Sequence, residues 1–202
     1  MHLFLELTTL AFFLLTVAHA VARRGRIGVS IMAALLLLGF VRETFVVLYQ
    51  WLYGYAELHL MLGKTPVIAS IIWAYSIYIA VVWAEGITGQ ELRPAPPGVA
   101  FLGACAAFMI CLVGFYEPFL ELVGMAKWEE GTRRTLGVPW IALVGYPTLT
   151  VPFLAGWSAI AGRFRDRPGS PWGQRSAMVA FVIALAFVHA WGLQLLKSVL
   201  GW

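Results

Sequence analysis

The chain alternates between long apolar runs and short polar segments. Because a helix of about 20 apolar residues crosses the ~30 Å hydrocarbon core of a bilayer, runs of that length indicate membrane spans. Six runs qualify, at residues 3–21, 27–50, 66–88, 98–122, 139–161 and 175–197. The pattern predicts an all-α fold, a polytopic membrane bundle of about six transmembrane helices that forms a single domain over residues 1–202.

Composition favours the same class of protein. Hydrophobic residues make up 61% of the chain and charged residues only 12%, about half the share usual in a soluble domain. The first span ends in Ala18-His19-Ala20, as a signal peptide does, but it carries Glu6 and has no Lys or Arg. We therefore expect it to be retained as a helix.

Basic residues are distributed unevenly between the loops. The loops after spans one, three and five hold eight arginines: Arg23, Arg24, Arg26, Arg93, Arg163, Arg165, Arg167 and Arg175. The loops after spans two and four hold four basic residues, Lys64, Lys127, Arg133 and Arg134, together with Glu129 and Glu130. The positive-inside rule predicts a bacterial-type cytoplasmic membrane protein with both termini outside, so that the loop at Gly131 faces outward and the loop at Gly169 inward.

The net charge of +4 is accounted for by these loops. Basic loops next to membrane spans contact anionic lipid headgroups. We therefore expect membrane lipids as partners, and no nucleic acid.

Spans two and three are repeated in spans four and five. The matching positions are Glu43 with Glu117 and Leu62-Gly63 with Leu136-Gly137 at an offset of 74, then Pro66 with Pro139 and Trp73 with Tyr146 at an offset of 73. Such self-similarity indicates a duplicated two-helix unit, with copies at about 27–88 and 98–161. Each copy holds two spans and so has the same orientation, which predicts a parallel repeat about an axis along the membrane normal.

The repeat brings two acids to matching depth. Glu43 and Glu117 both lie toward the outer ends of their spans, in one layer with Trp73 and Tyr146. Carboxylates at membrane depth are costly and usually face the bundle interior, so the pair predicts a functional site. Two alternatives are an ion pair between Glu43 and Arg42, and snorkelling of both acids to the outer surface.

Glu121 is a third candidate acid, one helical turn after Glu117 on the same face. Two acids this close can keep one proton between them and supply a general acid. The alternative places Glu121 in headgroup water. Pro147 and Pro152 interrupt span five and free backbone carbonyls, either as packing kinks or beside a cavity.

Two histidines and two cysteines lie within apolar spans. His19 and His189 would bind haem or a metal if their helices touched, and the alternative is a hydrogen-bonded core residue for each. Cys105 and Cys111 have no Cys or His neighbour at metal-ligand spacing. We predict no metal and no cofactor, and the sequence has no nucleotide-binding or serine-hydrolase motif.

The motifs around Glu117 resemble those of the carotenoid-hydratase family of membrane proteins, which includes bisanhydrobacterioruberin hydratase and gamma-carotene hydratase. The resemblance rests on Gly114-Phe115-Tyr116-Glu117-Pro118-Phe119, Gly124, Trp128 and Leu136-Gly137-Val138-Pro139-Trp140, and upstream on Glu43, Gly63, Pro66 and Trp73. It spans residues 39–160. The chain is shorter than typical members, and it has Ala142 and Gly145-Tyr146 where the family commonly has Asn and Gly-Trp.

The resemblance implies addition of water to a terminal double bond of a lipophilic isoprenoid or carotenoid. The residue types suit this chemistry, because a carboxylic acid protonates the alkene, aromatic faces stabilise the cation, and a second carboxylate takes a proton from water. The candidate catalytic residues are Glu43, Glu117 and Glu121. The candidate substrate-binding residues are Trp73, Tyr75, Tyr116, Trp128 and Tyr146.

Other functions use the same features. A terpene cyclase protonates an alkene in the same way and lets an internal double bond replace water. A small transporter also combines parallel repeats with broken helices. A non-catalytic membrane subunit that binds lipid or pigment beside partner subunits would fit the short loops. A closed aromatic pocket around both acids favours the enzyme, a polar path to both faces favours transport, and lipid-facing acids favour the subunit.

Overall fold

The computed structural model describes the chain except residues 1, 50–52, 56–57, 166–170 and 202. The helices are α1 (His2–Arg24), α2 (Arg26–Tyr49), α3 (Val67–Thr88), α4 (Val99–Leu122), α5 (Trp140–Arg165) and α6 (Pro171–Leu200). All six are long and apolar enough to cross a membrane. The predicted fold class, a polytopic membrane bundle of six helices, is confirmed.

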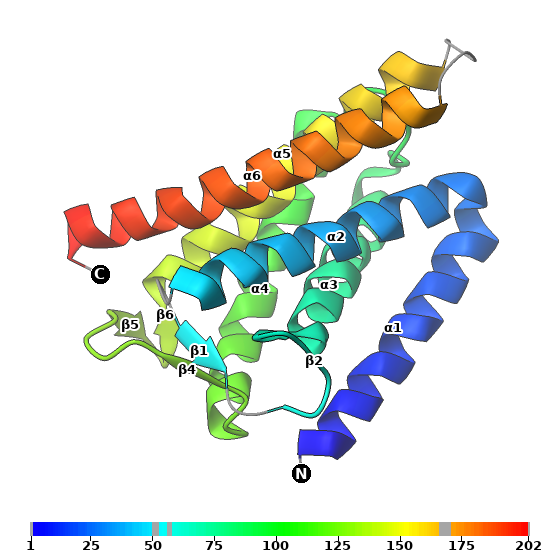
Figure 1. Ribbon diagram of the computed structural model, residues 1–202. Coiled ribbons are helices and arrows are strands. Elements are labelled where there is room, and N and C mark those ends of the chain that lie inside the picture. The colour runs from blue at the N-terminus through cyan, green and yellow to red at the C-terminus, as the bar shows by residue number, and fades with distance from the viewer. Residues whose placement is uncertain (1, 50–52, 56–57, 166–170, 202) are drawn as a thin grey trace.

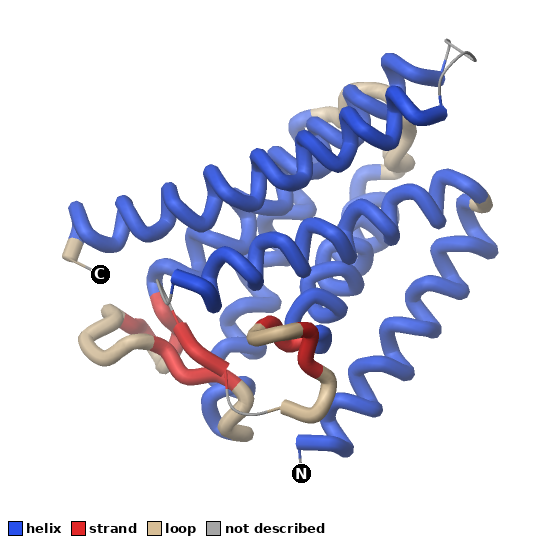
Figure 2. Tube along the Cα trace, in the orientation of Figure 1, coloured by secondary structure: helices blue, strands red, loops and turns tan. Residues whose placement is uncertain are grey.

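The two ends of the bundle differ. At one end α1 is connected to α2 and α3 to α4, and α5 ends and α6 begins there; the other end carries the short strands together with the start of α1 and the end of α6 (Figures 1 and 2). We call the second end the hairpin end. In the predicted α5–α6 turn, Arg167, Pro168, Gly169 and the side chain of Arg165 lie outside the described part of the chain.

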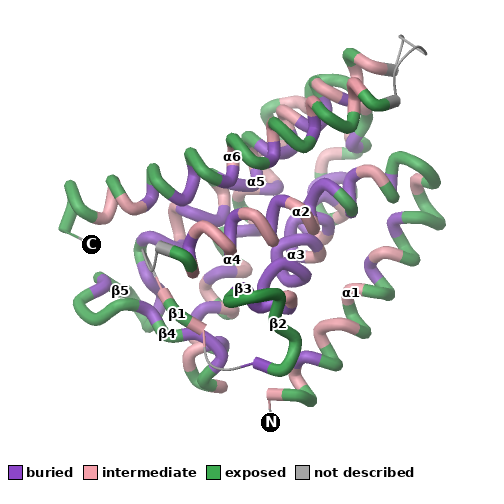
Figure 3. Tube along the Cα trace, in the orientation of Figure 1, coloured by how far each residue is buried: buried purple, intermediate pink, exposed green. Residues whose placement is uncertain are grey.

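Helix α3 lies at the centre of the bundle and is the most enclosed of the six (Figure 3). It packs against α1, α2 and α4, while α6 covers α2 and α5. Gly39 lets α2 approach α3 closely, because a Cβ atom there would lie 2.6 Å from the Ser70 carbonyl oxygen. One turn farther along α2, this approach brings Glu43 next to Trp73.

Three pairs of short antiparallel strands cover the hairpin end. Two are hairpins within a repeat unit, β2 (Met61–Leu62) with β3 (Thr65–Pro66), and β5 (Arg134–Thr135) with β6 (Val138–Pro139). The third joins the two units: β1 (Tyr53–Tyr55) pairs with β4 (Ala126–Trp128), with Gly54 opposite Lys127. Each unit therefore has the order helix, strand, hairpin, helix, and its first strand pairs with the equivalent strand of the other unit.

The hairpins correct one detail of the predicted repeat. Their strands match at an offset of 73 throughout, so that Gly63 is equivalent to Leu136 and not to Gly137. Gly63 (φ 62°) and Leu136 (φ 53°) each open a two-residue turn in the left-handed region. The sequence match of Leu62-Gly63 with Leu136-Gly137 is thus wrong by one residue, because Leu136 belongs to a turn and not to a strand.

The orientation in the membrane remains a prediction that labelling can test. In a Cys111→Ala background, we expect Glu130→Cys, exposed between β4 and β5, to react with an impermeant maleimide added to intact cells. Glu91→Cys, exposed between α3 and α4, should react only after permeabilisation. Position 130 is labelled and not the neighbouring Gly131, because the φ of 84° at Gly131 disfavours a side chain. Reversed labelling would put the hairpin end in the cytoplasm.

Candidate functional site

Glu43 is fully buried and is surrounded by donors. Its Oε1 accepts the indole N–H of Trp73 at 2.5 Å, and its Oε2 accepts the hydroxyl of Tyr55 at 2.6 Å. The Tyr53 hydroxyl lies 3.0 and 2.9 Å from the two oxygens, and Arg42 Nη1 donates to Oε1. A buried cation and three neutral donors are the partners that favour the ionised form of a carboxylate.

Glu117 has a different environment. It is 5% exposed, its Oε1 accepts the hydroxyl of Tyr146 at 2.6 Å, and its Oε2 accepts the indole N–H of Trp128 at 2.7 Å. No cation forms an ion pair with it among the described residues. One neutral donor per oxygen leaves room for a proton, so Glu117 is the better of the two acids to hold one.

The difference follows from one position of the repeat. Arg42 precedes Glu43, whereas Tyr116 precedes Glu117 at the offset of 74. The alternative ion pair of Glu43 with Arg42 is therefore present, but it is buried, with Arg42 only 3% exposed. Neither acid snorkels to the surface.

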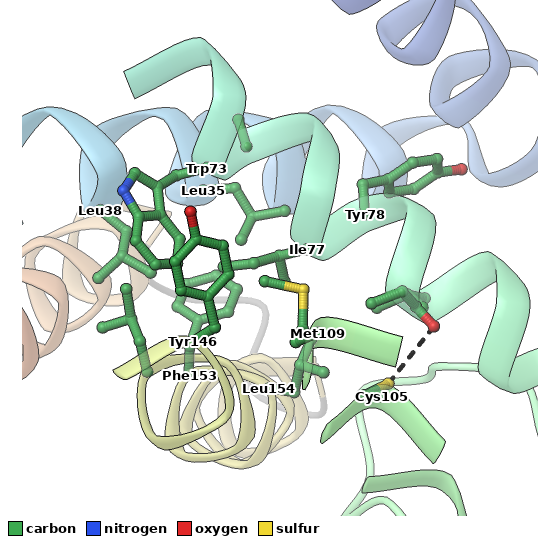
Figure 4. Packing of buried hydrophobic residues seen from close by; sticks show 14 of the residues in the cluster. Leu35, Leu38, Trp73, Ile77, Tyr78, Cys105, Met109, Tyr146, Phe153 and Leu154 are labelled. Carbon is green, nitrogen blue, oxygen red and sulfur yellow. Dashed lines mark hydrogen bonds between the residues drawn. The ribbon is translucent and has the colours of Figure 1, made fainter. Parts of the chain in front are cut away.

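Aromatic rings from the two units meet between the acids. The rings of Trp73 and Tyr146, which are equivalent in the repeat, lie 4.6 Å apart, and those of Tyr53 and Trp128 lie 4.7 Å apart (Figure 4 shows the first pair). In each pair, one member donates to the acid of the first unit and the other to the acid of the second. The two acids therefore share one closed aromatic layer. Burial raises the pKa of the Tyr53 phenol, which keeps it a neutral donor.

Three cavities adjoin this layer. An open cleft of about 1000 Å³ lies at the hairpin end, and Tyr53, Tyr55 and Trp128 line it. An inner cavity of about 30 Å³ is lined by Tyr53, Tyr55, Trp73, Tyr116, Glu117 and Tyr146 among others. A smaller one of about 10 Å³ is lined by residues including Arg42, Tyr53, Glu117 and Trp128. Since about 10–15 Å³ admits one water, the inner cavities hold one or two waters at most.

Glu121 does not join the other two acids. Arg134 binds both carboxylate oxygens of Glu121, with Arg134 Nη2 at 2.9 Å from Glu121 Oε1. The Glu121 side chain is 24% exposed. Oε1 also accepts the backbone N–H of Trp128 at 3.3 Å. Glu121 therefore does not share a proton with Glu117 as expected, because Arg134 of the β5 strand pairs with Glu121 instead.

The predicted aromatic residues fall into two groups, those that bind a carboxylate directly and those that do not. Trp73, Trp128 and Tyr146 bind the carboxylates directly, as described above. Tyr75 and Tyr116 bind each other through their hydroxyls, 3.0 Å apart. Tyr116 lines the inner cavity, and the ring of Phe12 on α1 packs edge-on against Tyr75 at 5.2 Å. These two residues form the side wall of the site toward α1.

The two histidines and Cys105 each have a separate partner. His19 Nδ1 lies 3.1 Å from the Tyr78 hydroxyl, and His189 Nε2 lies 2.9 Å from the carbonyl oxygen of Gly145. Cys105 is buried and its thiol lies 3.6 Å from the Ala80 carbonyl oxygen (Figure 4). Within the described residues no group of three His, Cys, Asp or Glu side chains could hold a metal. Pro147 and Pro152 lie inside a continuous α5.

Sequence reasoning missed two tyrosines and two carboxylates. Tyr53 and Tyr55 lie in a short connection without periodicity, although a tyrosine on each side of a glycine could have drawn attention. Glu6 is fully buried and accepts the backbone N–H groups of His59 and Leu60, both at 2.9 Å. Glu85 is bound by Arg23 and Arg24 at the opposite end of the bundle. Glu6 and Glu85 fasten helix α1 to the rest of the bundle.

Comparison of the chain with family models, curated proteins and solved structures finds no match.

Proposed function

We propose that the protein is a membrane-embedded enzyme that protonates a terminal C=C of an isoprenoid or carotenoid and adds water to it. The observation that carries the proposal is the pair of unequal acids in one closed aromatic layer. Glu117 has only neutral donors, while Glu43 is paired with Arg42. One acid is thus suited to give a proton and the other to receive one.

The chemistry follows from this difference. Glu117 gives its proton to the less substituted carbon of the double bond, which leaves a tertiary cation and the Glu117 carboxylate. The rings of Trp73 and Tyr146 stabilise the cation through their negative faces. Water then bonds to the cationic carbon, and the proton it loses is finally held by the Glu43 carboxylate. The sum is one alkene and one water giving one tertiary alcohol.

Cavity size favours water over an internal alkene as the second reactant. The cavity beside Glu117 has about 30 Å³, enough for one or two waters. A cyclase must enclose a folded chain, which needs a far larger space. The cavity walls away from the acids are apolar, with Ile68, Ile72, Leu120 and Met125. A hydrocarbon end group would enter by displacing side chains on that apolar side.

The competing functions have less support. Transport requires a polar path to both faces, whereas apolar side chains such as Leu35, Ile77 and Phe153 fill the bundle core beneath the acids (Figure 4). A subunit that only binds lipid or pigment has no use for two buried carboxylates on its inner side. Burying such groups is costly unless they do chemistry or fix a structure.

Expression in cells that make lycopene or shorter polyprenyl compounds tests the proposal. We expect products heavier by one water that carry a tertiary hydroxyl at the chain end. Isomers of unchanged mass with a ring would favour the cyclase. Unaltered lycopene and polyprenyls, with the protein present in the membrane, would remove the enzyme and leave the lipid-binding or pigment-binding subunit.

A further inference from the structure

Tyr53 borders all three cavities. Of the residues that line them, it is the one common to the open cleft and both inner cavities. Glu117 lines the two inner cavities, whereas Glu43 lines none of the three. A water that reacts beside Glu117 therefore does not contact Glu43 directly. A proton from this water can reach Glu43 only through the side chains that are hydrogen-bonded to Glu43.

The hydroxyl of Tyr53 has the contacts of a relay group. It lies 3.0 and 2.9 Å from the two oxygens of Glu43, and Arg42 Nη1 donates to it. A phenol has one proton to donate and two lone pairs to accept. With the proton directed to Glu43 and one lone pair taken by Arg42, the second lone pair is left for water in the inner cavities.

We infer that Tyr53 relays a proton from the attacking water to Glu43, an inference that rests on the proposed hydration. As the water oxygen bonds to the tertiary carbon, one water O–H bond breaks and its proton joins the Tyr53 oxygen. The original Tyr53 proton moves to Glu43. Tyr53 ends neutral, Glu43 ends protonated, and the alcohol carries no charge.

The same residue restores the starting state. Glu117 has lost the proton that Glu43 gained, so one proton must return. The cavity of about 10 Å³ is lined by both Tyr53 and Glu117 and is about the size of one water, which would connect the two side chains. The proton passes back from Glu43 through Tyr53 and this water to Glu117, and the open cleft supplies the next water.

Tyr55 offers a matched comparison on the same strand. Its hydroxyl also donates to Glu43, at 2.6 Å, and it lines the cleft and the larger inner cavity. It is not among the residues that line the small cavity with Glu117. Loss of either hydroxyl removes a bond to Glu43, but only loss of Tyr53 breaks the route between the two acids.

Turnover of lycopene in D₂O by purified protein in nanodiscs tests the relay. In D₂O, protonation of the alkene by Glu117 adds deuterium, and loss of a proton from the cation then returns a deuterated alkene. The ratio of deuterated alkene to alcohol therefore measures how often the cation reverts to alkene before water adds to it. We expect Tyr53→Phe to raise this ratio at least tenfold, and Tyr55→Phe to keep the wild-type ratio even where its rate is lower. An unchanged ratio in Tyr53→Phe, with both products reduced in parallel, would overturn the relay.

Two further arms separate the possible failures. Wild-type protein that gives neither alcohol nor deuterated alkene overturns hydration, and the relay with it. If Tyr53→Phe does not fold, 3,5-difluorotyrosine at position 53 retains the hydroxyl and makes it more acidic. The relay then predicts that alcohol formation declines at lower pH than in the wild type, since the phenol must be protonated. An unmoved pH profile would mean that Tyr53 only supports the structure.

Discussion

Glu117→Gln is expected to leave a folded protein that no longer hydrates the double bond. An amide has no proton acidic enough to transfer to an alkene, and a positioned general acid contributes about 10²–10⁴-fold to a rate. The Tyr146 hydroxyl can still donate to the Gln carbonyl oxygen. The amide NH₂ cannot accept the indole N–H of Trp128, so one buried hydrogen bond is lost, at a cost of about 1–3 kcal/mol. Alcohol formed per mole of purified protein measures the first effect, and thermal unfolding in detergent the second.

Glu121→Gln is the matched control, one turn farther along α4. Its partner is Arg134 at a partly exposed position, where an ion pair contributes about 0–1 kcal/mol, so turnover and stability should both stay close to wild type. Hydration at the normal rate in Glu117→Gln would exclude Glu117 as the acid. Loss of hydration in Glu121→Gln would instead support the hypothesis, based on the helical spacing, that Glu117 and Glu121 share a proton.

The helices were predictable because apolar length is a property of the sequence alone. The runs at 66–88 and 98–122 match α3 and α4 within one residue at each end. The last helix extends beyond its run of 175–197, beginning at Pro171. Its first turn contains Trp172 and Gln174, residue types that suit the membrane interface and lie before the continuous apolar run.

Part of the site was predictable because the repeat is a symmetry. Residues at equivalent positions near the axis must approach each other, and Trp73 and Tyr146 do so at 4.6 Å. Of the donors from the connections, Trp128 was among the predicted residues, whereas Tyr53 and Tyr55 were not. Tyr53, Tyr55 and Trp128 reach the acids through the pairing of β1 with β4, which spans three residues and has no hydrophobic periodicity.

The expected pairing of Glu121 with Glu117 is absent for a physical reason. A spacing of four residues on a helix predicts a shared face, but it does not say which residue outside the helix competes for the side chain. Here the hairpin brings Arg134 against Glu121. The same limit applied to Arg42, whose adjacent position predicts the ion pair with Glu43 but does not say that the pair is buried in the core of the site.

Arg42→Met is expected to give the largest loss of stability in this protein. Arg42 is 3% exposed, and its side chain also lies over the Trp73 ring, with Cζ 5.0 Å from the ring centroid. Removing one member of a buried ion pair leaves the other charge without compensation, which typically costs about 3–5 kcal/mol. We expect that decrease in the free energy of unfolding, measured by titration with SDS in mixed micelles.

A second substitution separates charge from packing. In Arg42→Met with Glu43→Gln, no uncompensated charge remains. The Gln oxygen can accept the Trp73 indole N–H and the Tyr53 hydroxyl, and the Gln NH₂ can donate to the Tyr55 hydroxyl oxygen. The double variant should therefore be more stable than Arg42→Met alone, since replacing both members of a buried pair is often neutral. It should also be inactive, because no carboxylate is left to receive the proton from water. If the single and double variants are equally unstable, Arg42 contributes to stability by packing on Trp73. The positive charge of Arg42 would then not be what stabilises the Glu43 carboxylate.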